Sequence, residues 1–144
     1  DIDKKILSLA KKIAKDFPSS NKPNFIESDI TKDVMDSHYD VAFSNGVLEH
    51  FKDSDIKKII KNHLSFADYL VIGIPTKFFN DDEALYGDER FLKLSYWRKL
   101  IDKSGGKIIE ECSYHYMTPF EKLKSINKIF RPKPFRVFVI TKKS

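Results

Sequence analysis

A short apolar run that leads directly into a polar turn constrains the fold of this chain more than any other feature. Residues 39–43 (YDVAF) have the length and composition of a buried strand, and residues 44–46 (SNG) supply the break where such a strand leaves its sheet. In open α/β sheets, ligands bind outside the carboxyl ends of the strands. We therefore expect Ser44, Asn45, Glu49 and His50 to lie where a cofactor or substrate would bind.

Helical and strand-like segments alternate along the rest of the chain. Apolar residues recur at helical spacing behind Asp3, a good N-cap, and again in three later segments. Runs that are apolar on both faces, such as residues 70–72 and 137–140, indicate central strands covered on both sides. This alternation predicts an α/β fold. The expected helices are residues 4–16, a segment capped by Asp53 or Ser54, a segment capped by Ser95, and residues 120–130; the expected strands are residues 25–29, 40–44, 69–74, 107–114 and 135–141.

The bulk composition agrees with a single domain, residues 1–144. The chain of 144 residues is 41% hydrophobic and 33% charged, enough to bury one core. No apolar run approaches the ~18 residues that span a bilayer, and no secretory signal pattern opens the chain, so a cytoplasmic location is expected. The single cysteine, Cys112, excludes an internal disulfide and a cysteine-based zinc site.

The net charge of +5 comes mainly from scattered lysines. Because no aromatic residues interleave with them, we interpret them as solvated helix faces and do not expect nucleic acid as a partner. A denser basic set near the C-terminus leaves two interpretations open: it contacts an anionic substrate or RNA, or it protects a sheet edge. This set comprises Lys128, Arg131, Lys133, Arg136, Lys142 and Lys143.

Several segments, in their order, resemble the class I S-adenosyl-L-methionine (SAM) dependent methyltransferases. Residues 47–50 (VLEH) match the motif that follows the fourth strand in the small-molecule, ubiquinone-methyltransferase-like group. Residues 24–30 (NFIESDI) resemble that family's third strand, residues 69–75 (YLVIGIP) its fifth, and residues 95–110 the helix, glycine turn and sixth strand that follow. The resemblance implies a Rossmann-like sheet with helices on both faces and SAM as cofactor.

The glycine-rich turn of the family's first strand has no counterpart, since no G-x-G occurs in these 144 residues. By resemblance, Asp1 closes the second strand, so the first two strands would precede it and the domain is expected to be N-terminally truncated. Without those partners an isolated strand at residues 25–29 would be marginal. We also expect weak or absent SAM affinity for these residues alone.

The resemblance also assigns cofactor contacts. Asp1 would accept the ribose hydroxyls, Ile2 would support the adenine ring, Asp29 would accept the adenine amino group, and Ile30 would offer its backbone N–H to the ring. The alternative for Asp1 and Asp29 is a strand-end carboxylate that caps a turn.

Ser44 and Asn45 would hold the methionine portion of SAM, with Gly46 permitting close approach. His50 is the candidate catalytic base, since an imidazole with a pKa near ~6.5 can take a proton at neutral pH. The alternative is structural: His50 begins the next helix and packs beside the cofactor. Related motifs carry an additional acid that helps to bind a divalent metal. Gly46 occupies that position here, so no metal is expected.

Residues 76–94 are the least regular stretch and are the candidate wall of the substrate site. The alternative is that their aromatic residues close the core while the acidic ones stay solvated. The sequence thus predicts SAM-dependent methyl transfer to a small-molecule acceptor, with no membrane partner. The alternatives are a non-catalytic methyltransferase-like binding module and an RNA-directed methyltransferase.

Overall fold

The computed structural model describes residues 1–16, 23–76, 87–114 and 135–143. None of the helices in this part of the chain is both long and apolar enough to span a membrane. In chain order the elements are α1 (Lys4–Ala14), β1 (Tyr39–Asn45), the short 3-10 helix η1 (Leu48–His50), α2 (Asp53–Phe66), β2 (Ala67–Pro75), α3 (Leu94–Lys103), β3 (Gly106–Tyr114) and β4 (Phe135–Lys142).

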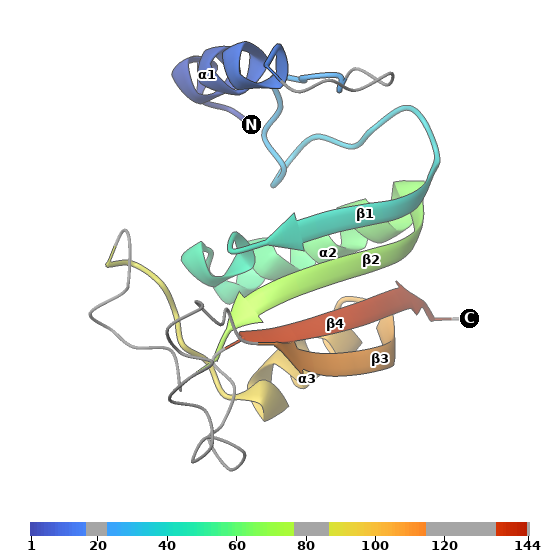
Figure 1. Ribbon diagram of the computed structural model, residues 1–144. Coiled ribbons are helices and arrows are strands. Elements are labelled where there is room, and N and C mark those ends of the chain that lie inside the picture. Colours follow the sequence, from blue (N-terminus) through green and yellow to red (C-terminus); the bar gives the residue numbers. More distant parts are fainter. Residues whose placement is uncertain (17–22, 77–86, 115–134, 144) are drawn as a thin grey trace.

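The strands form one mixed sheet with the order β1-β2-β4-β3 (Figure 1). β1 and β2 are parallel, with Asn45 opposite Gly73, whereas β4 runs antiparallel to both β2 and β3. Parallel neighbours require a crossover, which α2 supplies between β1 and β2. The carboxyl ends of β1 and β2 therefore lie side by side, and the Rossmann-like α/β class expected from the sequence is confirmed.

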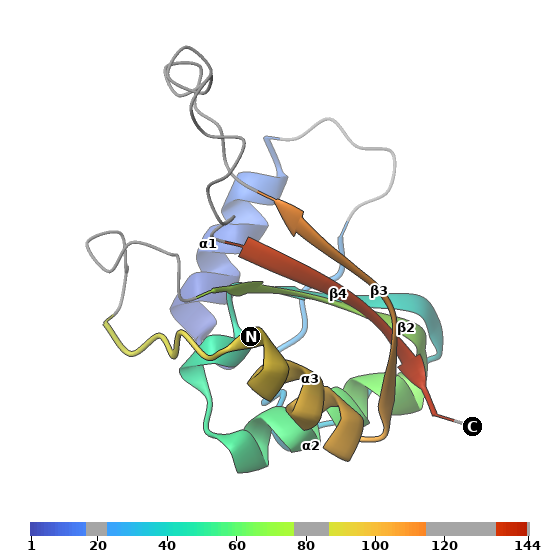
Figure 2. The same cartoon turned by 90° about the horizontal axis from the view of Figure 1, so that it is seen from below.

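Helices α2 and α3 cover one face of the sheet (Figure 2). Each helix buries its predicted apolar stripe against the sheet. Alternate residues of β2 and β4 pack against these stripes. Trp97, Ile101 and Phe138 are fully buried there. The other core members are Ala42, Leu48, Ile56, Ile59, Ile60, Leu64, Ala67, Leu70, Ile72, Ile74, Leu100 and Ile140.

The second face of the sheet is more open. Val41 and Phe43 of β1 are 52% and 68% exposed, and Tyr69 of β2 is 44% exposed. Helix α1 lies beyond the β1 edge (Figure 1), and Leu7 is its buried residue. The helical layer that packs closely on the sheet in the described residues is therefore that of α2 and α3.

One predicted strand is wrong: residues 25–29 have no strand structure. Two hydrogen bonds of parallel type replace it, from Asp1 N to Ile26 O (3.2 Å) and from Ser28 N to Asp1 O (3.0 Å). A strand needs a ladder of partners, and among the residues that the structure describes Asp1 supplies these two backbone bonds.

Helix starts were predicted with mixed success. Asp3 caps α1 as expected, accepting from Lys5 N (2.7 Å) and Ile6 N (3.3 Å). The residues preceding α2 and α3 are Lys52 and Lys93, neither of which makes a side-chain cap, so the predicted caps at Asp53, Ser54 and Ser95 are wrong. The expected helix at residues 120–130 lies outside the described residues.

Candidate functional site

The turn after β1 is built around Gly46. Its φ of 66° lies in the left-handed region, which glycine adopts at little cost. Its N–H donates to the carbonyl oxygen of Gly73 (3.1 Å), so the turn is tied to β2. The chain then enters η1, where Leu48 and Glu49 are buried and His50 is half-buried. The sequence therefore placed this polar turn correctly at the carboxyl end of β1.

The Asn45 side chain lies across β2. A Cβ atom at Gly73 would overlap Asn45 Oδ1, so the absence of a side chain at position 73 makes room for this amide. Tyr114 at the end of β3 donates its hydroxyl to Asn45 Oδ1 (3.0 Å), and its ring stacks on Phe135. Asn45 of β1 therefore contacts both Gly73 of β2 and Tyr114 of β3. Ser44 is half-buried and lies opposite Ile72 of β2.

Residues 88–90 are held against η1 by Arg90. Its backbone N–H donates to Glu49 O (3.1 Å), and its guanidinium donates to Phe51 O (2.6 Å) and Asp53 Oδ1 (2.7 Å). Tyr96 of α3 also donates to Asp53. This bracing brings Asp88 to His50, with Asp88 Oδ1 2.6 Å from His50 Nδ1. Sequence analysis missed these partners because 38 residues separate them.

Glu49 is buried, with 3% of its surface exposed. Its Oε2 has no hydrogen-bond partner among the described residues. Burial raises the pKa of this carboxyl, whereas a hydrogen bond from its own backbone N–H and the charge of His50 lower it. The charges of Glu89 and Asp88 raise the pKa further.

The same surroundings contain donor atoms of the kinds that a divalent metal uses. Ligand atoms of His50, Asp88 and Glu89 all lie within 4.8 Å of one another. The expectation of no metal, which rested on Gly46, stays a prediction.

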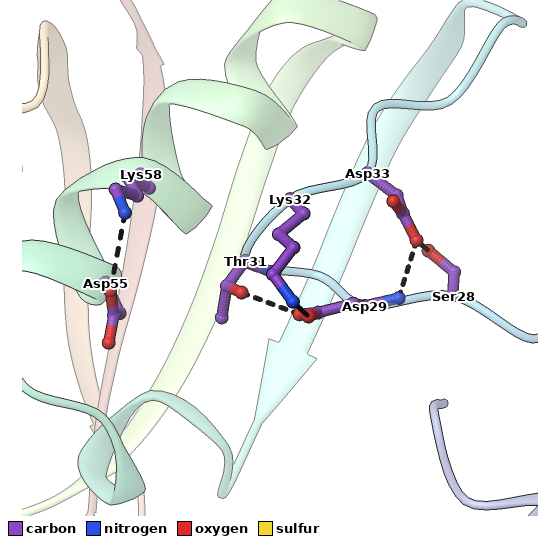
Figure 3. A network of polar contacts seen from close by, with 7 residues as sticks. All are labelled: Ser28, Asp29, Thr31, Lys32, Asp33, Asp55 and Lys58. Carbon is purple, nitrogen blue, oxygen red and sulfur yellow. Dashed lines mark hydrogen bonds and ion pairs between the residues drawn. The ribbon is translucent and has the colours of Figure 1, made fainter.

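Asp29 lies in a polar loop with partners of its own (Figure 3). Its Oδ1 accepts from Thr31 N (3.0 Å) and Thr31 Oγ1 (2.6 Å), and its Oδ2 pairs with Lys32 Nζ (2.8 Å). The Lys32 and Thr31 hydrogen bonds lower the pKa of Asp29 to about 2. The turn-capping interpretation therefore describes its contacts, and the adenine role stays a prediction. Figures 1 and 3 both show this loop beside β1.

The other residues proposed to contact adenosine are Asp1, Ile2 and Ile30. The backbone bonds of Asp1 to Ile26 and Ser28 hold Asp1 beside the segment that leads to Asp29. The Asp1 carboxylate also accepts from Asp3 N (2.9 Å), Ile2 is exposed, and Ile30 packs against the core. The structure therefore brings Asp1 and the Asp29 segment together on one side of β1.

Comparison with known proteins gives a class for this architecture. No family model matches the chain, and no curated protein matches it. Solved structures do match over nearly the whole chain, with TM-scores of 0.67 to 0.73 for two SAM-dependent methyltransferases. The protein has the class I SAM-dependent methyltransferase fold, in agreement with the strand order described above.

The first of these structures is magnesium protoporphyrin IX methyltransferase from Synechocystis with bound SAM. It is 19% identical at a TM-score of 0.67, and the match covers 99% of this chain and 57% of that one. The second, from Clostridium acetobutylicum, is 13% identical at a TM-score of 0.73, covering 100% of this chain and 74% of that one. A third, described as a pericyclic reaction enzyme, is 15% identical at a TM-score of 0.67. The match covers 97% of this chain and 34% of that one. This chain therefore spans about half to three quarters of the two methyltransferases, and the fold by itself does not fix the reaction.

Proposed function

We propose that the protein binds SAM and transfers its methyl group to a small-molecule acceptor. The observation that carries the proposal is that the parallel strands β1 and β2 end side by side, with the turn at Gly46 and the residues Asn45, Glu49 and His50 at that edge of the sheet. Ligands of open α/β sheets bind at this position. SAM would supply an electrophilic methyl group, so the protein has chiefly to bind, align and exclude water.

The cofactor contacts follow the sequence prediction. Asp1 and Asp29, with Ile2 and Ile30, would hold the adenosine, and Ser44 and Asn45 would hold the methionine portion. The fit is supported by the bare backbone at Gly46, where the nearest atom to an added Cβ would be Glu49 Oε1 at 3.8 Å, so that a ligand can approach closely. For Asp29 the proposal requires that the carboxylate accept from adenine in addition to, or in place of, Thr31 and Lys32.

His50 would act as the base. Asp88 is 2.6 Å from Nδ1, which favours the tautomer with a proton on Nδ1 and leaves Nε2 as the atom that takes a proton. Asp88 would then be a positioning residue, because it orients the imidazole through Nδ1.

Calorimetry with SAM on the full-length protein tests the proposal. We expect binding in the parent, a loss of at least about tenfold in affinity for Asn45→Ala and for Asp29→Ala, and unchanged affinity for Glu110→Ala on the exposed surface of β3. Equal affinity in all four proteins would remove the proposed site.

The non-catalytic binding module is retained as the second candidate because the Asp29 carboxylate is already engaged within its own loop. A protein that binds SAM but never releases S-adenosylhomocysteine with any acceptor would favour this candidate.

A further inference from the structure

The Asn45 side chain is held in one orientation at the edge of the sheet where β1 and β2 end. Tyr114, the last residue of β3, donates its hydroxyl to Asn45 Oδ1 (3.0 Å). β2 and β4 lie between β1 and β3 in the sheet, so this hydrogen bond reaches across the ends of two strands. It ties the Asn45 amide to a strand with which β1 does not pair.

The position of Gly73 shows which side of this amide faces β2. The atom nearest to a Cβ at position 73 would be Asn45 Oδ1, followed by Asn45 Cγ at 3.0 Å and Asn45 Cβ at 3.6 Å. Asn45 Nδ2 lies farther away than these three atoms. The oxygen side of the amide therefore faces β2, and the nitrogen side is turned away from it.

The phenol ring of Tyr114 is itself fixed. It stacks on Phe135, with 5.2 Å between the ring centroids and 18° between the ring planes. Tyr114 and Phe135 are also paired in the ladder between β3 and β4. Because the ring is held by stacking, its hydroxyl meets Asn45 Oδ1 in a fixed position.

The nitrogen of this amide is the group left for a ligand. Asn45 is exposed, and within the part of the chain that the structure describes its Nδ2 donates to no other residue. An amide nitrogen offers two N–H donors and no lone pair for accepting, so it pairs with oxygen atoms and not with ammonium groups. A carboxylate, which only accepts, is the complementary group.

We propose that Tyr114 is a positioning residue, which orients Asn45 so that Nδ2 donates to the methionine carboxylate of SAM. This inference rests on the proposed function, in which Asn45 holds the methionine portion of SAM. Without the Tyr114 hydroxyl the amide is free to turn over and present Oδ1, which repels a carboxylate. An amide that is already oriented loses less freedom when the ligand binds. The site would therefore distinguish SAM from a methyl donor that lacks the carboxylate.

The test is calorimetry of the full-length protein with SAM and with decarboxylated SAM, which keeps the sulfonium and the amino group. We expect the parent to bind SAM at least about tenfold more tightly, because a hydrogen bond to a charged group is lost with the carboxylate. Tyr114→Phe keeps the stacked ring and removes the hydroxyl. It should weaken SAM binding by about three- to tenfold and leave the affinity for decarboxylated SAM unchanged.

Tyr69→Phe is the matched control, since it removes a phenol hydroxyl near the start of β2, at the opposite end of that strand from Gly73. It should bind both donors like the parent.

Asn45→Asp is the second variant. Its side chain has the same size and still accepts from Tyr114, but it presents only oxygen atoms and a negative charge. We expect this variant to bind decarboxylated SAM more tightly than SAM, which reverses the preference of the parent.

Equal losses for the two donors in Tyr114→Phe would mean that the hydroxyl only supports the sheet edge, and would overturn the inference. Unchanged SAM binding in Tyr114→Phe would overturn it as well, as would an Asn45→Asp variant that keeps the preference of the parent. A parent that binds both donors equally contradicts this inference alone. A parent that binds neither donor contradicts the proposed function, and this inference with it.

Discussion

At the scale of single residues, the contact between Gly73 and Asn45 is the tightest constraint of the site. A Cβ atom at position 73 would overlap Asn45 Oδ1, so the amide would have to move and lose its bond from Tyr114. We expect Gly73→Ala to lower the free energy of unfolding by about 1–3 kcal/mol, the usual cost of overpacking. Urea denaturation measures this change.

A double-mutant cycle isolates the cause. If the overlap with Asn45 is responsible, Gly73→Ala should cost much less in an Asn45→Ala background than in the parent. An equal cost in both backgrounds would show that the strand backbone, and not the Asn45 side chain, rejects the methyl group.

Glu49 is expected to make stability depend on pH. Its pKa is raised in the folded state, mainly by burial, so the folded state holds this proton more tightly than the unfolded state. The stabilising contribution is fully present below the unfolded pKa and is lost as the pH rises through the folded pKa. Glu49→Gln removes the ionisation and should therefore stabilise the protein at pH 8, on the order of 1 kcal/mol, with a smaller gain at pH 4.

Denaturant unfolding of Glu49→Gln and the parent at both pH values gives the comparison. Glu110→Gln, on the exposed surface of β3, should show no such pH-dependent difference. A gain for Glu49→Gln that is the same at pH 4 and pH 8 would show that Glu49 does not titrate in this range.

At the scale of secondary-structure elements, Arg90 braces the stretch before α3 against η1 and α2. Its guanidinium bonds to Phe51 O and Asp53 are partly buried. We expect Arg90→Ala to cost about 1–3 kcal/mol, because both acceptors lose a charged donor. Hydrogen exchange at residues 88–92 should become faster in the same variant.

Arg98 offers the matched comparison, since it also makes two bonds to a carboxylate, Glu111, at 2.9 and 2.8 Å. Its side chain is 48% exposed, compared with 32% for Arg90. Arg98→Ala should therefore cost only about 0–1 kcal/mol. Equal losses for the two variants would mean that Arg90 acts as an ordinary surface ion pair.

The elements predictable from sequence are those whose pattern is local. The stripes of α2 and α3 and the four observed strands follow from periodicity, because their apolar residues face one core. The caps of α2 and α3 were not predictable. Asp53 looks like a cap in sequence, yet its carboxylate is used by Arg90 and Tyr96, which are distant in the chain.

The candidate site was predictable to the same extent. The turn at residues 44–46 and its place beside β2 follow from the strand pattern and the α/β fold. The approach of Asp88 to His50 does not, because it depends on how the stretch before α3 packs. A signal was present in the consecutive charged residues 88–90 (DER), but sequence alone does not say which partner they meet.

At the scale of the whole molecule, the sheet is asymmetric. α2 and α3 cover one face (Figure 2). On the other face, Val41 and Phe43 of the edge strand β1 and Tyr69 of β2 leave apolar surface exposed. Exposed apolar patches beside an unpaired edge favour association between chains. We expect the protein to self-associate in a concentration-dependent way through this open face, and we expect the same face to bind an apolar dye.

Phe43→Lys is expected to reduce both effects, because it places a charge on the exposed face at the edge. Phe43 is 68% exposed, so the free energy of unfolding should change by no more than about 0.5 kcal/mol. The matched control is Ile13→Lys on α1, an apolar residue that is 47% exposed and lies away from the sheet. Sedimentation at several concentrations should show less association for Phe43→Lys only. If Ile13→Lys reduces association as much, overall charge is the cause, and the open face of the sheet is not.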